Sequence, residues 1–150
     1  MSVTVRAARA EEAEALTELA MRAKASWGYD AAFMAACRAE LTVTPERIVA
    51  WRVWVAEADG EVAGMVALSL DGGAEVEDFF VEPAFQGRGV GRALMATLVQ
   101  ACRAAGATTL TVDADPNAEG IYTRLGFRTV GHSPSGSIPG RFLPRMEMSL

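Results

Sequence analysis

Along the first part of the chain, the spacing of apolar residues predicts one strand followed by two helices. Residues 3–7 alternate between apolar and polar side chains, which is the period of a half-buried strand. Over residues 11–24 the apolar side chains recur every three or four positions, which is the period of an amphipathic helix. Gly28 interrupts that pattern, and Asp30 is a suitable N-cap for a second, alanine-rich helix that ends near Glu40.

The next segments predict three consecutive strands. Residues 51–57 and 62–70 are both rich in β-forming residues, and Asp59-Gly60 between them is a strong signal for a two-residue hairpin. A second turn at residues 71–73 leads into a third strand over residues 75–81. Strands joined by such tight turns pair antiparallel.

Beyond Pro83 helices and strands alternate. The elements predicted there are a helix over residues 92–105 that ends at Gly106, a strand over 109–113, a short helix that begins at Asp115-Pro116 and stops at Gly126, and final strands over 127–130 and 143–149. The whole order is β-α-α-β-β-β-α-β-α-β-β. Because the hairpins join antiparallel neighbours, we predict one mixed α/β domain over residues 1–150 whose sheet is not wholly parallel.

Composition narrows the class of protein. The chain has 150 residues, of which 51% are hydrophobic and 22% charged, as is typical of one soluble globular domain. No apolar run approaches the roughly 18–20 residues that cross a bilayer, and the first residues lack the apolar block of a secretion signal. Cys37 and Cys102 supply neither a disulfide framework nor a metal site, so we expect a cytoplasmic protein without a metal. His132 is the only histidine, and its Gly-, Pro- and Ser-rich surroundings disfavour a Ser-His-Asp triad.

The net charge of −5 is unevenly distributed. Residues 1–82 carry 7 basic and 15 acidic side chains, whereas residues 83–150 carry 7 basic and 4 acidic ones. This division disfavours general nucleic-acid binding, which requires a broad basic face. It suits a protein that holds an anionic cofactor on one side and a cationic substrate on the other. A chance scatter of surface charge is the alternative.

Three glycines mark the point where a strand is predicted to lead into a helix. Gly87, Gly89 and Gly91 leave backbone amides unshielded, and amides at a helix N-terminus form a binding site for anions. Arg88 and Arg92, four residues apart, add positive charge that can lie along one helical edge. We interpret the loop as a pyrophosphate site, and the alternative is a flexible turn with two solvated arginines.

Two common nucleotide motifs do not fit this loop. The dinucleotide pattern G-x-G-x-x-G needs a third glycine at position 92, which is Arg92. A P-loop needs Gly-Lys-Ser/Thr, and Lys24 is the only lysine of the chain.

The spacing Gln86-x-x-Gly-x-Gly91 instead resembles the acyl-CoA signature of the GNAT superfamily of N-acetyltransferases. The resemblance extends upstream through residues 75–83, which are similar to the fourth strand of that family. It extends downstream through the helix over 92–105 to Asn117, Tyr122 and Leu125-Gly126-Phe127, and so covers about residues 75–131. It implies the GNAT fold, a mixed sheet flanked by helices, with acetyl-CoA as the acyl donor.

The resemblance also implies where the cofactor binds. The pyrophosphate would lie on the amides of the glycine loop, and the pantetheine arm would enter between the fourth and fifth strands like an extra strand. A main-chain N–H, that of Val81, would face the thioester oxygen and stabilise the oxyanion. Asn117 either bonds the pantetheine arm or is an ordinary polar residue near a helix start. The implied cofactor-binding residues are Phe79, Phe80, Val81, Gln86, Gly87, Arg88, Gly89, Val90, Gly91, Arg92 and Asn117.

Tyr122 is the predicted general acid. A thiol has a pKa of about 8.5 and a tyrosine one of about 10, so a phenol can protonate a departing thiolate. Its position also matches the tyrosine that members of the superfamily use for this step. The alternative is a core tyrosine.

A base must accept the proton of the acceptor amine, and two carboxylates are candidates. Alternation along a strand predicts that Glu75 and Glu77 share one face with Phe79 and Val81. The alternative for both is a solvated position at the strand edge. Asp78, on the other face, is the weaker candidate.

Trp27, Tyr29 and Asp30 lie between the first two helices and are the candidate acceptor site. The two aromatic rings would form a wall for a cation, or else they are buried core residues. The loop over residues 133–141 closes over the site or simply connects two strands.

We therefore predict an N-acetyltransferase that transfers an acetyl group from acetyl-CoA to a primary amine of a small molecule or peptide in a ternary complex. One alternative is a binding module that keeps the CoA cleft without turnover. Another is a nucleotide-binding domain of a different type. A two-fold homodimer is the commonest assembly of such domains.

Overall fold

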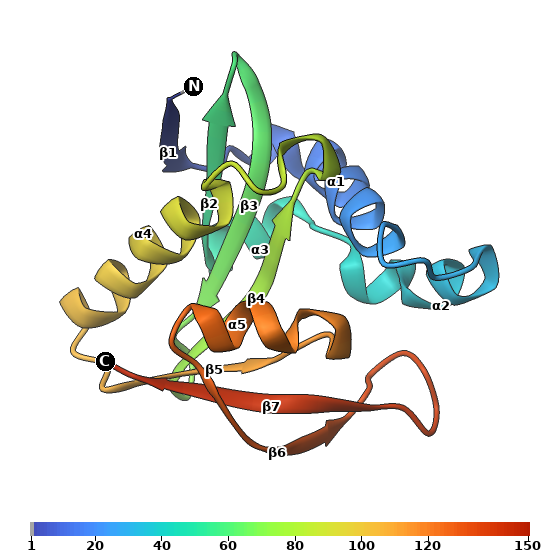
Figure 1. Ribbon diagram of the computed structural model, residues 1–150. Helices are drawn as coiled ribbons and strands as arrows, with labels where there is room; N and C mark the ends of the chain where they lie inside the picture. Colours follow the sequence, from blue (N-terminus) through green and yellow to red (C-terminus); the bar gives the residue numbers. More distant parts are fainter. Residues whose placement is uncertain (1) are drawn as a thin grey trace.

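The computed structural model describes residues 2–150, and a mixed β-sheet runs through the middle of the molecule (Figure 1). The order of its seven described strands is β1-β2-β3-β4-β5-β7-β6. Only β4 and β5 pair in parallel, and the other neighbours are antiparallel. The strands are β1 (Val3–Ala7), β2 (Arg52–Ala58), β3 (Glu61–Ser69), β4 (Ala74–Val81), β5 (Thr109–Asp113), β6 (Arg128–Pro134) and β7 (Phe142–Ser149). The predicted mixed sheet is confirmed.

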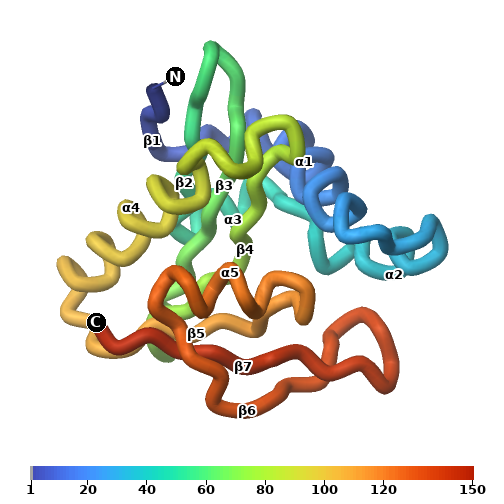
Figure 2. Tube along the Cα trace, in the orientation of Figure 1, coloured from blue at the N-terminus to red at the C-terminus, as the bar shows by residue number. Residues whose placement is uncertain are grey.

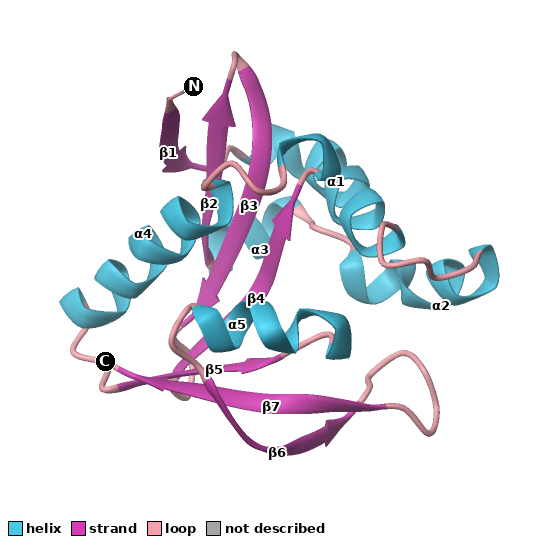
Figure 3. Ribbon diagram, viewed as in Figure 1, coloured by secondary structure: helices cyan, strands magenta, loops and turns pink. Residues whose placement is uncertain are grey.

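Helices cover both faces of the sheet (Figure 3). They are α1 (Ala13–Ala25), α2 (Ala31–Leu41), α3 (Pro45–Ala50), α4 (Val90–Ala104) and α5 (Glu119–Arg124), with short 3-10 turns at Ala10–Glu12, Pro83–Phe85 and Pro116–Ala118. Buried side chains of α4 and α5 pack with one core cluster, and those of α1 and α3 pack with a second cluster on the opposite face. Helix α2 packs beside α1 and forms a third, smaller cluster.

The sequence prediction missed α3. Thr44 caps this helix, because its side-chain oxygen accepts a hydrogen bond from the backbone N–H of Arg47 at 3.1 Å. Pro45 occupies the first turn, where its missing N–H costs nothing. Thr-Pro-Glu is therefore a helix-start signal that hydrophobic periodicity alone did not reveal, since the helix has only six residues.

A bulge in β4 changes which side chains share a face. Ala67 of β3 lies opposite Asp78, but the next residue, Leu68, lies opposite Val76, so Glu77 is an extra residue without a partner. Beyond the bulge the alternation is shifted by one position. Phe79 and Val81 consequently pack in the same core cluster as Val76, whereas Phe80 packs on the opposite face. The prediction that Glu75 and Glu77 share a face with Phe79 and Val81 is wrong for this reason.

Strands β4 and β5 remain neighbours for only a short distance. Their parallel pairing covers residues 74–76 and 110–112. Beyond this point β4 continues to Val81, while β5 ends at Asp113 and the two strands diverge (Figure 1). The edge of β4 that faces β5 is therefore left without a neighbouring strand over residues 77–81.

Helix α4 approaches β4 closely at its first turn. A Cβ atom added to Gly91 would lie 3.2 Å from Cζ of Phe79, which is tighter than ordinary van der Waals contact. The absence of a side chain at this position therefore lets the glycine loop lie directly beside the open edge of β4.

The loop between β6 and β7 spans residues 135–141 and reaches toward α2 (Figure 2). Ile138 packs against the small α2 cluster, and Ser137 Oγ lies 3.6 Å from Cys37 Sγ. Residues far apart in the sequence therefore meet at one end of the opening between β4 and β5.

Candidate active site

A cavity of about 520 Å³ lies where β4 and β5 diverge. Strand β4, the loop that leads into α4, helix α5 and the ends of α1 and α2 all contribute to its wall. Apolar and charged side chains both line it, so it can hold a long ligand with an apolar arm and polar ends.

One end of the cavity is built from the glycine loop. Gly87 and Gly89 have φ angles of 76° and 82°, a left-handed conformation that glycine adopts at little cost. Gly89 is the N-cap of α4, so the first amides of a fifteen-residue helix are presented at this end. A helix N-terminus with exposed amides favours an anion. Lining residues from this segment are Phe85, Gln86, Gly87, Gly89, Val90, Gly91 and Arg92.

The two arginines of the loop point in different directions. Arg92 lines the cavity from the first turn of α4. The guanidinium of Arg88 lies over the ring of Phe85, 5.4 Å from its centroid, and 3.7 Å from Asp59 Oδ2 in the β2–β3 hairpin. Of the two, Arg92 is therefore the arginine that can reach a ligand in the cavity directly.

The open segment of β4 supplies a second wall. Phe79, Phe80 and Val81 all line the cavity, as do Glu77 and Asp78. With no strand paired on its β5 side, this edge can accept an extended ligand in place of a strand.

Tyr122 closes the cavity from α5. Its side chain is buried, and its ring contacts Phe79 and Phe127 with centroid distances of 5.7 and 5.3 Å. Burial raises the pKa of the Tyr122 hydroxyl, and the negative charges of Asp78 and Asp115 raise it further. The hydroxyl therefore stays protonated at neutral pH and can act as a hydrogen-bond or proton donor.

Two of the three β4 carboxylates face the cavity. Burial and the charge of Glu77 raise the pKa of Asp78 to about 7, and burial followed by the charge of Glu75 raises that of Glu77. A carboxyl group with a pKa of about 7 is suited to general base catalysis near neutral pH. Sequence reasoning ranked Asp78 lowest because it placed this side chain on the strand face away from Phe79 and Val81, and β4 keeps it there, opposite Ala67, yet beside the cavity.

Glu75 lies outside this group. Its Oε1 accepts hydrogen bonds from Arg145 Nη2 at 3.0 Å and from Thr111 Oγ1 at 3.3 Å, and Arg145 also pairs with Asp113. Glu75 is thus part of a network that joins β4, β5 and β7 where the sheet is still closed.

The predicted acceptor residues separate into different roles. Trp27 lines the cavity and is 40% exposed. Asp30 caps α2 by accepting a hydrogen bond from the Phe33 N–H at 2.8 Å. Tyr29 stacks on Phe33 at a centroid distance of 4.0 Å, so the three residues do not form a common wall.

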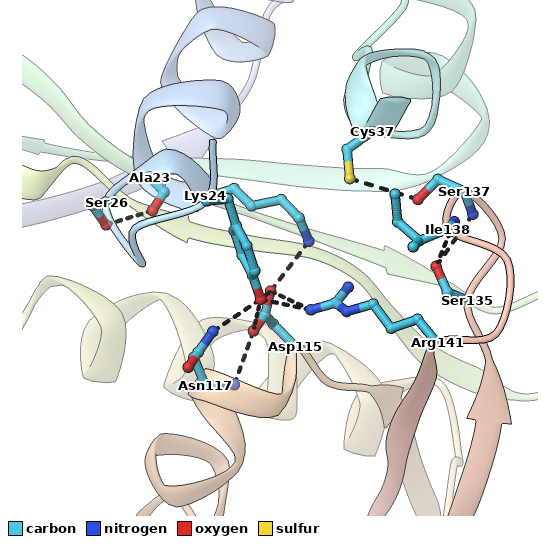
Figure 4. Close-up of polar contacts among 11 residues, drawn as sticks. Ala23, Lys24, Ser26, Cys37, Asp115, Asn117, Ser135, Ser137, Ile138 and Arg141 are labelled. Carbon is cyan, nitrogen blue, oxygen red and sulfur yellow. Dashed lines mark hydrogen bonds and ion pairs between the residues drawn. The ribbon is translucent and has the colours of Figure 1, made fainter. Parts of the chain in front are cut away.

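The hydroxyl of Tyr29 belongs to a polar cluster around Asp115 (Figure 4). Asn117 Nδ2 donates to Tyr29 Oη at 2.9 Å, so its side chain is directed to Tyr29 instead of the predicted pantetheine site. Lys24 and Arg141 complete the cluster, and we call these five residues the Asp115 cluster. Sequence reasoning did not predict Lys24, Asp115 and Arg141 as site residues, because nothing in the sequence indicates that these three distant positions meet.

Two further geometric results concern only residues 2–150. No three His, Cys, Asp or Glu side chains in that range come close enough to hold a metal ion. No helix in the same range is long and apolar enough to cross a membrane.

Known proteins resemble this chain in sequence and in fold. The family model of the acetyltransferase (GNAT) domain matches residues 13–150. The chloroplastic serotonin N-acetyltransferase 2 of Oryza sativa subsp. japonica is 38% identical over 81 residues, which cover 50% of this chain and 40% of that protein. The uncharacterized N-acetyltransferase ycf52 of Pyropia yezoensis is 33% identical over 73 residues, which cover 47% of this chain and 42% of the relative. This chain thus spans about two-fifths of the length of these curated relatives.

The fold has the same arrangement as solved acetyltransferases. The crystal structure of PaiA N-acetyltransferase from Thermoplasma acidophilum in complex with coenzyme A superposes with a TM-score of 0.81. The sequence identity is 18%, and 100% of both chains is covered. At this identity the likeness establishes a common fold.

The raised pKa of Asp78 predicts a specific pH dependence of stability. Unfolded aspartate has a pKa of about 3.9, so between about pH 4 and pH 7 the unfolded state is ionised while the folded state keeps its proton. Rising pH therefore lowers the free energy of unfolding in this window. Asp78→Asn has no carboxyl group at this position and does not lose stability in this way. Between about pH 4 and pH 7 the free energy of unfolding of the wild type should therefore fall relative to that of Asp78→Asn by more than about 1.4 kcal/mol, the equivalent of one pKa unit. Urea denaturation of both proteins from pH 4 to pH 8 measures the difference, and parallel curves would contradict the assignment.

Proposed function

The chain belongs to the GNAT acetyltransferase family, and on that premise we propose that it transfers an acetyl group from acetyl-CoA to a primary amine in a ternary complex. The main observation behind this proposal is the continuous cavity that lies where β4 and β5 diverge. That cavity joins an anion-binding loop to a protonated tyrosine and two carboxylates of raised pKa.

The donor would lie along the cavity with its pyrophosphate at the glycine loop. Backbone amides from Gly87 to Arg92 and the guanidinium of Arg92 would bind the phosphates. The pantetheine arm would extend beside the open edge of β4, and the N–H of Val81 would face the thioester oxygen. The coenzyme A complex of the T. acidophilum protein with the same fold supports this arrangement.

The transfer itself requires three proton movements. An acceptor ammonium first gives one proton to a base, directly or through water, and the neutral nitrogen attacks the thioester carbonyl carbon. The N–H of Val81 stabilises the resulting oxyanion. When the C–S bond breaks, Tyr122 donates its proton to the thiolate. The nitrogen then gives up a second proton, which restores the Tyr122 hydroxyl. The products are the N-acetylated amine and CoA thiol.

Asp78 is the carboxylate best suited to be the base, with Glu77 beside it. Both line the cavity, whereas Glu75 is held by Arg145 and Thr111. The charges of Asp78 and Asp115 both act on the Tyr122 hydroxyl, which supports a short path between base and acid.

Charge reversal at each arginine of the glycine loop should show which of the two binds the donor. Arg92→Glu replaces an attractive contact to phosphate with repulsion, and we expect acetyl-CoA to bind more weakly by about tenfold or more. Arg88→Glu, whose wild-type side chain lies beside Asp59 and Phe85, should have the smaller effect. Isothermal titration calorimetry with acetyl-CoA measures both. Equal dissociation constants for Arg92→Glu and the wild type would exclude Arg92 from the phosphate site.

Loss of the tyrosine hydroxyl should affect turnover much more than donor binding. General acid catalysis contributes roughly 10²–10⁴-fold, so kcat of Tyr122→Phe should fall by about 100-fold. Thiol release from acetyl-CoA in the presence of an amine panel gives kcat, and calorimetry shows whether the donor still binds. Wild-type protein that binds acetyl-CoA but releases no thiol with any amine would support the non-catalytic binding module instead.

The base assignment predicts the pH profile of the reaction. With an acceptor amine of pKa about 10, which stays an ammonium from about pH 5 to pH 8, kcat/KM of the wild type should rise as Asp78 ionises, with a midpoint near its pKa of about 7. Asp78→Asn should react more slowly and lose this rise, whereas Glu75→Gln should keep it. An unchanged profile in Asp78→Asn would assign the base to another group.

A further inference from the structure

The Asp115 cluster brings together two cations and one carboxylate (Figure 4), and two of its members, Lys24 and Asp115, line the cavity. Lys24 Nζ lies 3.2 Å from Asp115 Oδ2, and Arg141 Nη2 lies 3.5 Å from the same oxygen. The side chains of Lys24, Asp115 and Arg141 are only 14%, 14% and 17% exposed. Charges at this depth are poorly screened by solvent, so the charge balance of the cluster matters.

Asp115 also accepts hydrogen bonds from groups other than the two cations. Its Oδ1 accepts from the Asn117 N–H at 2.9 Å, and both of its oxygens lie 3.0 Å from the Tyr29 hydroxyl. Burial opposes ionisation of Asp115, but the Asn117 amide and Lys24 nevertheless hold its pKa below the ordinary value. Within the cluster, the single negative charge of Asp115 is therefore shared between two half-buried cations, Lys24 and Arg141.

Tyr29 does not add a second negative charge. Burial raises the pKa of its hydroxyl, and Asp115 raises it further, so the phenol is neutral. The Arg141 guanidinium lies 5.3 and 5.0 Å from the ring centroids of Tyr29 and Phe33, which stabilises the cation without neutralising it. The cluster consequently carries a net charge of +1.

Of the two cations of the Asp115 cluster, Lys24 is the one that lines the cavity. It lines the cavity together with Asp115 and Trp27, and Asp115 uses one of the three N–H donors of its ammonium group. Carboxylates also line the same cavity, through Glu77 and Asp78 of β4 and Glu40 of α2. A ligand that bears both a positive and a negative group matches a lining with charges of both signs.

We propose that Lys24 forms a carboxylate-binding subsite and that the acceptor is an amine that also bears a carboxylate, that is, an amino acid. The inference rests on the proposed acetyl transfer and names its substrate class. The ammonium group of the acceptor would lie toward Asp78 and Tyr122, and its carboxylate would accept a charge-assisted hydrogen bond from Lys24. A single carboxylate balances the single excess charge of the cluster, whereas a phosphate dianion would not.

Matched pairs of amines test the proposal. L-phenylalanine is compared with 2-phenylethylamine, and L-lysine with cadaverine, so that each pair differs by one carboxylate. Thiol release from acetyl-CoA gives kcat/KM for each, corrected for the fraction of neutral amine. The wild type should prefer the amino acid of at least one pair by about tenfold or more, as expected for one hydrogen bond between charged groups.

Substitutions at Lys24 then identify the source of the preference. Lys24→Met should reduce kcat/KM for the preferred amino acid by about tenfold and leave that for its carboxylate-free partner nearly unchanged. Lys24→Arg, which keeps the charge, should retain most of the preference. Arg38→Met removes one positive charge from α2 at its surface pair with Glu18 and should preserve the preference.

Three results would contradict the subsite. Equal or greater kcat/KM for both carboxylate-free amines in the wild type would overturn it while leaving acetyl transfer intact. An equal loss for both members of a pair in Lys24→Met would assign Lys24 a structural role only. Release of no thiol with any of the four amines would count against the acetyl transfer itself and, with it, the subsite.

Discussion

The divergence of β4 from β5 after three paired residues is the feature on which the rest of the site depends. Two parallel strands that separate leave an unpaired strand edge, and buried backbone groups require hydrogen-bond partners. An extended ligand can supply them, which is why the cavity lies here and not over a face of the sheet. The glycine loop and Tyr122 of α5 both line this one cavity.

Two local features, one in β4 and one in α4, shape the wall of this opening. The bulge at Glu77 reverses the alternation of side chains, and it turns Phe79 and Val81 toward α4 and α5. Glu77 and Asp78 line the cavity together, where burial raises the pKa of both, the charge of Glu77 raises that of Asp78 further, and the charge of Glu75 raises that of Glu77. Gly91 then lets α4 lie directly against Phe79, which brings the amides of the helix N-terminus beside the strand that would carry the acyl arm.

Charged side chains of both signs line the cavity. The carboxylates of β4 and α2 suit an ammonium group, and Lys24 supplies positive charge at the Asp115 cluster. That cluster also ties together three distant segments: the end of α1, the start of the turn before α5, and the loop before β7. Asp115 caps the turn that leads to α5, so the contacts that hold the cation also hold the helix that carries Tyr122.

Short-range patterns in the sequence were sufficient for most of the elements and for the glycine loop. Helical and strand periodicity, the Asp59-Gly60 hairpin and the Asp115-Pro116 helix start depend on neighbours within a few residues, and all of these appear in the structure. The spacing of Gly87, Gly89 and Gly91 likewise predicted a glycine loop before α4, and the structure has this loop at one end of the cavity. Local patterns alone were thus enough for the class of fold and for the position of the glycine loop. Tertiary contacts, by contrast, place Asp78 beside the cavity and Glu75 with Arg145, direct Arg88 to Asp59, and bring Lys24, Asp115 and Arg141 together. These outcomes depend on register and on contacts between distant segments, which no local pattern encodes.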